Sequence, residues 1–246
     1  MATQVAKAST RASSLVTRTL LLVWQDPDNR RFLPVAELHH LADGRFSFAY
    51  LEAARTHGSF FALDEYSDLD KVYVSDSLPV FFANRVMSPD RPDYGQYLEW
   101  LGLRGADPGD VPVEVLARTG GGRATDTFHV VDRPLRGEDH FESRFFVSGL
   151  RHVPGAATLL ADVQPGDRLE LRPEPDNVSN SKAVIIDVES RQQLGWVPDW
   201  LCGEVTEMID QGWEIALVAE RVNPDAPSHT RVLCRLNATS RHIIQS

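Results

Sequence analysis

Cysteine, lysine and long apolar runs are scarce in this chain of 246 residues, and each scarcity excludes a class of protein. The only cysteines, Cys202 and Cys234, are too few for a disulfide framework or a multi-cysteine metal site. No apolar run approaches the roughly 20 residues of a membrane-spanning helix. The apolar stretch at residues 20–24 is also too short for a signal-peptide core. We therefore expect a cytoplasmic protein with reduced thiols and no membrane partner.

Positive charge is also in deficit, and it is not concentrated in either half of the chain. Residues 1–140 hold 15 Lys and Arg against 20 Asp and Glu, and residues 141–246 hold 10 against 15. Non-specific DNA affinity comes largely from basic side chains that displace counterions, so we expect no broad duplex-binding face. Lysine occurs only at positions 7, 71 and 182, so contacts with anions must come from arginine.

Motifs of the common enzyme classes are missing. The chain has no G-x-S-x-G elbow, Walker loop or kinase catalytic loop, and no H-x-x-x-H or C-x-x-C pair. The triple glycine at residues 120–122 precedes a strand pattern and therefore predicts a turn, not a phosphate cradle. We expect no enzyme activity, no catalytic residues, no cofactor and no metal. A hydrolase assembled from distant His and Asp residues is the least favoured alternative.

Apolar periodicity predicts an α+β fold in two domains. In the N-terminal half, period-2 patterns predict a small antiparallel sheet, and spacings of three and four predict helices. The predicted strands are residues 19–25, 31–36, 44–50 and 125–131, and the predicted helices are 51–57, 78–87, 94–103 and 111–118. In the C-terminal half, short strands at regular spacing predict a small barrel with one or two helices. Those strands are residues 143–149, 168–172, 183–188, 194–197, 213–222 and 230–236, with a helix at 200–211.

The domain limits follow from these patterns and from composition. We expect a flexible arm at residues 1–18, a first domain at 19–131, a polar linker at 132–140 and a second domain at 141–246.

Five linked motifs stand out in the C-terminal half: G-L-R at 149–151, P-G-D at 165–167, E-P-D-N at 174–177, A-V at 183–184 and G-W-V-P at 195–198. Arg151 and His152 are expected at a strand end beside a glycine. An arginine next to a planar ring can hold one phosphate and stack on one base. The alternative is a surface arginine beside a histidine that only packs.

This order of motifs resembles the HIRAN domain, from Phe145 to about Ala238. The resemblance implies an OB-like barrel that captures the 3′-hydroxyl end of single-stranded DNA. Carried over by position, Arg151 would hold the phosphate and His152 would replace a stacking tyrosine. Trp196 would supply a second stacking ring. In the loop after Asn177, the family's second tyrosine and its aspartate are replaced by Ser179 and Asn180, and Asn180 would bond the terminal hydroxyl.

The N-terminal half, about Thr19 to Val131, resembles the N-terminal subdomain of HipA-type toxin kinases. The resemblance rests on L-L-L-V-W, G-R-F-S-F-A-Y-L, L-P-V-F-F-A-N-R-V-M and Y-L-E-W-L-G-L. It implies a module that docks a partner protein, such as a toxin kinase or a nuclease. Together the halves predict a bacterial, non-catalytic adaptor that binds ends of single-stranded DNA. The alternative is a purely protein-binding or antitoxin-like regulator that does not bind DNA. The sequence leaves the oligomeric state open.

Overall fold

The computed structural model describes residues 16–122 and 126–240 of the chain. Residues 1–15 of the predicted flexible arm lie outside the described residues, whereas residues 16–18 already belong to a strand. The chain divides into two compact units, one formed by Met1–Tyr94 and Gly105–Arg133, the other by Gly95–Arg104 and Pro134–Ser246. The predicted linker at residues 132–140 contains a short strand, β6 (Leu135–Arg136).

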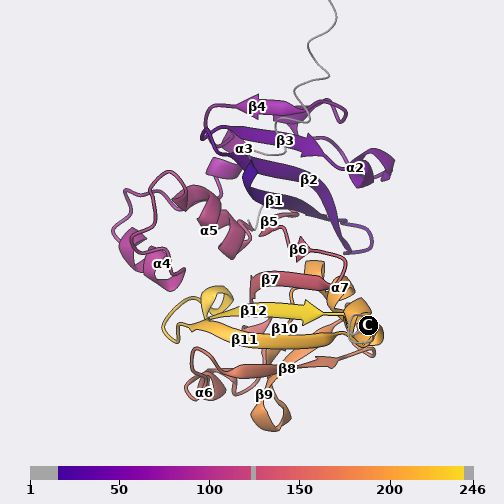
Figure 1. Cartoon of the computed structure of the whole chain (residues 1–246), viewed down its shortest axis with the longest axis vertical. Coiled ribbons are helices and arrows are strands. Elements are labelled where there is room, and N and C mark those ends of the chain that lie inside the picture. The colour runs from indigo at the N-terminus through magenta and orange to yellow at the C-terminus, as the bar shows by residue number, and fades with distance from the viewer. Residues whose placement is uncertain (1–15, 123–125, 241–246) are drawn as a thin grey trace, which may run out of the picture. The chain divides into compact units, whose positions relative to one another are not determined.

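The first unit is built on a five-stranded antiparallel sheet with the order β4-β3-β2-β1-β5 (Figure 1). Its strands are β1 (Val16–Gln25), β2 (Phe32–Leu41), β3 (Phe46–Tyr50), β4 (Tyr73–Ser75) and β5 (Phe128–Asp132). Its helices are α2 (Glu52–Thr56), η2 (Asp64–Tyr66), α3 (Val80–Ala83) and α5 (Val111–Thr119). Alternate residues of β1, β2 and β3 face one apolar core, in which Leu20, Leu38 and Phe48 are fully buried. The period-2 prediction is confirmed for β1 and β3. The strand predicted at residues 31–36 is present but the predicted range is too short, because β2 continues to Leu41.

The predicted helix at residues 78–87 is wrong in length, because α3 ends at Ala83. Beyond it, the buried Arg85 donates to Asp126 at 2.6 Å and to the carbonyl of Gly121 at 2.9 Å. These tertiary hydrogen bonds hold Arg85 where the next helical turn was predicted. Local periodicity cannot predict them, because they join residues that are far apart in the sequence. Gly120, with φ of 75°, ends α5, and Gly121 also has a positive φ. The turn predicted at the triple glycine is therefore confirmed.

The second unit contains a seven-stranded antiparallel sheet with the order β10-β9-β8-β11-β12-β7-β6 (Figure 1). Besides β6, its strands are β7 (His140–Phe146), β8 (Arg168–Pro173), β9 (Val184–Val188), β10 (Gln192–Trp196), β11 (Glu214–Val222) and β12 (Val232–Thr239). Its helices are η3 (Leu150–His152), α6 (Ala156–Leu160), η4 (Glu189–Arg191), α7 (Asp199–Asp210) and η5 (Ser228–Thr230). All of α4 (Tyr94–Trp100) except its first residue also belongs to this unit. The α+β class with antiparallel sheets is therefore confirmed.

This sheet curls without closing into a complete barrel. Its end strands, β10 and β6, are not paired with each other among the described residues. However, Trp196 at the end of β10 exchanges two backbone hydrogen bonds of 2.9 Å with Ser148, just beyond β7. The curl brings β10 against η3, which is the arrangement that positions the candidate site.

No helix in the described part of the chain is long and apolar enough to cross a lipid bilayer.

Candidate functional site

Arg151 and His152 lie in the 3-10 turn η3 instead of at a strand end. Gly149, with φ of 68°, starts this turn, and the buried Leu150 fixes it to the core. Both following side chains are exposed, and Nε of Arg151 donates to Nε2 of His152 at 2.9 Å. Within the described residues, Arg151 forms no ion pair with a carboxylate, so the rest of its guanidinium fork can bind an anion.

A second histidine lies near Arg151, although it is distant in sequence. The turn η5, which contains His229, packs against η3. Burial removes water from the imidazole of His229 and lowers its pKa below the ordinary value of 6.5. The positive charge of Arg151 lowers this pKa further, by a smaller amount. The sequence pattern did not point to His229, because no local spacing links it to residue 151.

Trp196 lies at the end of β10, with its ring against Gly149. Its ring leaves no space for a side chain at Gly149, where a Cβ atom would lie 2.6 Å from Cε3 of the indole. The indole Nε1 donates to Oε2 of Glu174 at 2.8 Å. Trp196 is only partly buried, so its ring is held in one orientation while part of it remains accessible.

The loop after β8 is organised by Glu174 and Asn177. Nδ2 of Asn177 donates to Oε2 of Glu174 at 2.7 Å, and its Oδ1 accepts from the backbone N–H groups of Ser179 and Asn180. Nδ2 of Asn180 donates to Oδ1 of Asp199 at 3.3 Å, which connects the loop to the first turn of α7. The side chain of Asn177 therefore shapes the loop, and that of Asn180 is shared with Asp199.

The structure thus brings all five predicted residues into one connected region of the second unit. Arg151 and His152 adjoin Trp196 through Gly149, and Trp196 joins Asn177 and Asn180 through Glu174. Sequence reasoning missed the central position of Glu174, although this residue begins the E-P-D-N motif. The region combines a guanidinium, partly accessible aromatic rings and amide groups. Such a set can hold a phosphate and a planar ring.

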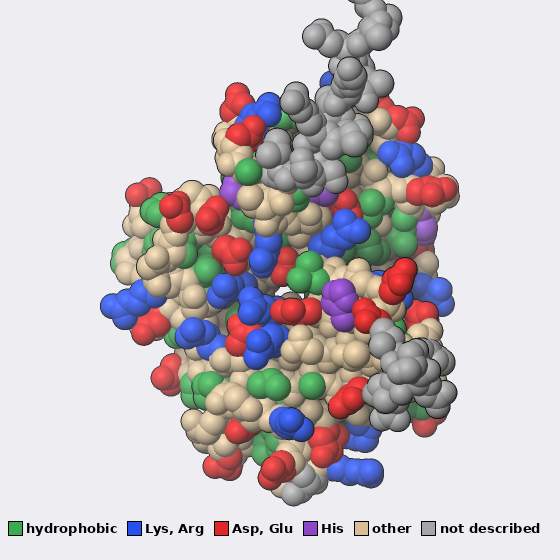
Figure 2. All heavy atoms as spheres, in the orientation of Figure 1, with side chains coloured by type: hydrophobic (Ala, Val, Ile, Leu, Met, Phe, Trp, Pro, Cys, Tyr) green, Lys and Arg blue, Asp and Glu red, His purple; other side chains and the backbone are tan. Residues whose placement is uncertain are grey.

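The charges elsewhere on the second unit do not form a broad basic field. On the face of the sheet shown in Figure 2, acidic and basic side chains alternate over β7, β12 and β11. Glu220 lies between two arginines, 3.0 Å from Arg144 and 3.8 Å from Arg235. An alternating surface of this kind does not favour a long duplex.

No group of three or more His, Cys, Asp and Glu side chains in the described parts of the chain could hold a metal ion. Cys202 and Cys234 are both buried and unbonded to each other. Burial raises the pKa of Cys202 to about 12 and that of Cys234 further, so neither thiol is a ready nucleophile.

The comparisons with known proteins concern the same half of the chain. A solved protein from Lactobacillus plantarum, a structural genomics target, is 17% identical, with a TM-score of 0.35; the match covers 44% of this chain and 94% of that one. The HIRAN domain of human HLTF is 18% identical, with a TM-score of 0.34 and coverage of 41% and 77%. The HLTF HIRAN domain in its DNA-bound conformation is 19% identical, with a TM-score of 0.27 and coverage of 42% and 74%.

No curated protein matches the chain. Residues 140–240 match the family model of the HIRAN domain, which spans β7 to β12 and includes all five predicted site residues. The C-terminal half of this chain is thus similar to the HIRAN domain, as its motifs predicted.

Proposed function

We propose that the second unit is a non-catalytic module that binds the 3′ ends of single-stranded DNA. The guanidinium of Arg151 holds a phosphate near the strand end, and the rings of His152 and Trp196 stack on bases. Asn180 bonds the terminal hydroxyl, and Asn177 holds the loop that presents Asn180. His229 adds a polar ring beside the phosphate, and its lowered pKa keeps it largely neutral at pH 7.

One observation carries this proposal: Arg151 is exposed, and no carboxylate among the described residues pairs with it. Several other arginines of the second unit are paired with carboxylates, as Arg172 is with the buried Asp187 at 2.7 Å and Arg144 is with Glu220 at 3.0 Å. The HIRAN match adds the expectation of DNA, since one solved HIRAN domain is in a DNA-bound conformation.

The test is a fluorescence anisotropy titration with single strands at low salt, where phosphate contacts contribute most. A strand with a 3′-hydroxyl should bind more tightly than the same strand with a 3′-phosphate or a circular strand. Equal binding of the three would contradict end recognition, and absence of binding would contradict the proposal as a whole.

A protein-binding role for the first unit is the second candidate function. Four apolar side chains of that unit are strongly exposed, namely Phe61, Val72, Val74 and Val80. Val74 belongs to β4, which is an edge strand of the sheet and can pair with an added strand. On this basis we propose that the first unit docks a partner protein. We further propose that it does so in a bacterial cytoplasm, which is the location expected from the sequence. A DNA titration without binding would favour this role as the protein's principal one.

A further inference from the structure

A segment far upstream of the HIRAN match belongs to the same compact unit. Residues 95–104, which include most of α4, group with the second unit, whereas residues 105–133 belong to the first. The match to the HIRAN family model begins only at residue 140. Leu101 and Leu103, near the end of the segment, are almost fully buried. The second unit therefore contains a packed part that the family match does not cover.

The C-terminal end of α4 has carbonyl groups without partners inside the helix. Gly102, with φ of 69°, follows the helix and donates its N–H to the carbonyl of Glu99 at 2.9 Å. The carbonyl of Trp100 accepts from Nδ2 of Asn223, in the loop after β11, at 2.8 Å. Nη1 of Arg221, in β11, donates to the carbonyl of Glu99 at 3.4 Å. Two side chains of the second unit thus cap the end of α4.

The amide of Asn223 also holds the turn η5. Its Nδ2 donates to the carbonyl of Thr230, the last residue of η5, at 3.0 Å. An amide nitrogen carries two hydrogens, so one side chain can serve the carbonyls of both Trp100 and Thr230. His229, which precedes Thr230, lies near Arg151. Asn223 therefore connects α4 to the turn that places His229 in the candidate site.

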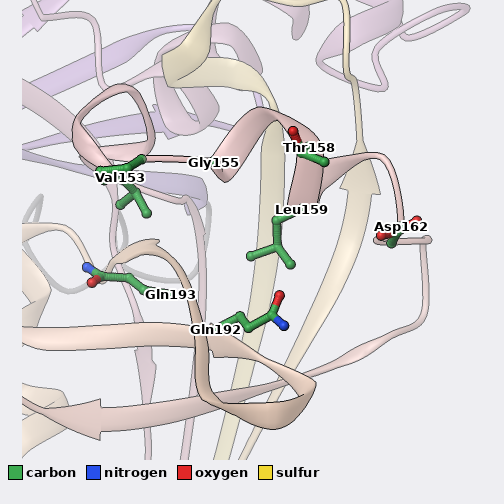
Figure 3. A pocket seen from close by; sticks show the side chains of 8 residues that line it. Val153, Gly155, Thr158, Leu159, Asp162, Gln192 and Gln193 are labelled. Atoms are coloured by element: carbon green, nitrogen blue, oxygen red, sulfur yellow. The ribbon is translucent and has the colours of Figure 1, made fainter.

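The turn η3, which carries Arg151 and His152, has packed neighbours on some sides only. It packs against β10 and η5. Val153, which directly follows η3, lines a pocket of about 460 Å³ together with Leu159 and Gln192 (Figure 3). A hollow supplies no atoms to contact, so the position of η3 depends more on β10 and η5. We expect displacement of η5 to loosen η3 as well.

We propose that residues 95–104 are a structural part of the strand-end site and that Asn223 is the positioning residue through which they act. With α4 in place, the amide of Asn223 holds η5 against η3, and His229 stays beside Arg151. The effect on DNA rests on the proposed function. The position of η5 does not require a bound strand.

The first measurement follows the imidazole of His229 by NMR in the full chain without DNA. Burial and the charge of Arg151 hold the pKa of His229 below 6.5. In Asn223→Ala this pKa should therefore move toward 6.5, and His229→Gln identifies the resonance. Asn237→Ala, which changes an exposed asparagine on β12, should leave the pKa unchanged.

A second variant separates the loss of the two hydrogen bonds from a failure to fold. Asn223→Leu keeps much of the shape of the side chain but removes the donor, so it should shift the pKa of His229 as Asn223→Ala does. Circular dichroism shows which variants are folded. An unchanged pKa in a folded Asn223 variant would overturn the inference.

The second measurement is an anisotropy titration of the full chain with a 3′-hydroxyl strand at low salt. Asn223→Ala should weaken binding by about threefold to tenfold, the size expected for one lost contact, and Asn237→Ala by less than about twofold. In the Arg151→Ala background, Asn223→Ala should add less than about twofold, because both changes act on the same site. Additive effects would show that Asn223 acts elsewhere and would overturn the inference.

The outcomes separate this inference from the proposed function. If the wild type binds strands but Asn223→Ala changes neither the pKa of His229 nor the affinity, the positioning role is wrong and end binding stands. If the pKa rises and the affinity is unchanged, residues 95–104 hold η5 but are not part of the strand-end site, and the inference is wrong. If the wild type binds no strand, the proposed function is wrong, and the pKa alone decides whether α4 positions η5.

Discussion

The indole of Trp196 is bonded to the carboxylate of Glu174, with 2.8 Å between Nε1 and Oε2. The same oxygen accepts from Nδ2 of Asn177 at 2.7 Å. One carboxylate therefore fixes both an aromatic ring and the loop beside it. This relationship makes Glu174 a positioning residue for the candidate site, although it is not expected to contact DNA.

Glu174→Ala should lower the free energy of unfolding by about 1 to 3 kcal/mol, because two donors lose a charged acceptor. Urea denaturation measures this change. Asp176→Ala removes an exposed carboxylate from the same loop and should change stability by less than about 0.5 kcal/mol. If the two variants were equally stable, Glu174 would not organise the loop.

Gly149→Ala should be more damaging than the same change at another glycine with a similar backbone. At Gly149, φ is 68° and the new Cβ would meet the ring of Trp196; at Gly212, φ is 72° and nothing lies within 4 Å. We expect losses of about 2 to 5 kcal/mol for Gly149→Ala and about 1 to 2 kcal/mol for Gly212→Ala, measured by urea denaturation. Equal losses would show that the contact with Trp196 contributes nothing.

Glu204→Gln should make the protein more stable at pH 7 but not at low pH. Burial raises the pKa of Glu204 above its ordinary value of 4.5, although Arg136 opposes the shift. The folded state thus favours the protonated acid, and the wild type loses stability as pH rises from 4.5 through the raised pKa. The difference in unfolding midpoint between variant and wild type should vanish below pH 4.5. A variant that is less stable at pH 7 would show that the pairing with Arg136 dominates instead.

Cys202 and Cys234 should not react with a thiol reagent at pH 8 in the folded protein, because both are buried and burial raises their pKa values. Both should react in guanidinium chloride. Rapid reaction of either thiol in the native protein would contradict their placement in the core.

Much of the fold could be predicted from local sequence patterns. Alternation predicted β1 and β3, and the shared face of Leu201, Val205 and Met208 predicted α7. These signals succeed because burial on one face imposes a period on the sequence. The short elements η3, α6 and β4 escaped prediction, since three to five residues are too few to show a period.

The candidate site was predicted only in part, because local motifs identify some of its residues but not the contacts between residues distant in the chain. Arg151, His152 and Trp196 lie within motifs, so their positions could be identified from the sequence. The bond between Glu174 and Trp196, and the approach of His229 to Arg151, join residues that are far apart in the chain. Such contacts depend on how the sheet curls, which no local spacing encodes.

The central claim is that Arg151 anchors the end of a single strand, and the most direct measurement compares Arg151→Ala with Arg168→Ala. Both remove an exposed arginine from the second unit, but Arg168 lies on β8, outside the candidate site. In anisotropy titrations at low salt with a 3′-hydroxyl strand, Arg151→Ala should weaken binding by about tenfold or more, whereas Arg168→Ala should change it by less than about twofold. Equal effects of the two substitutions, or no effect of Arg151→Ala, would contradict the account.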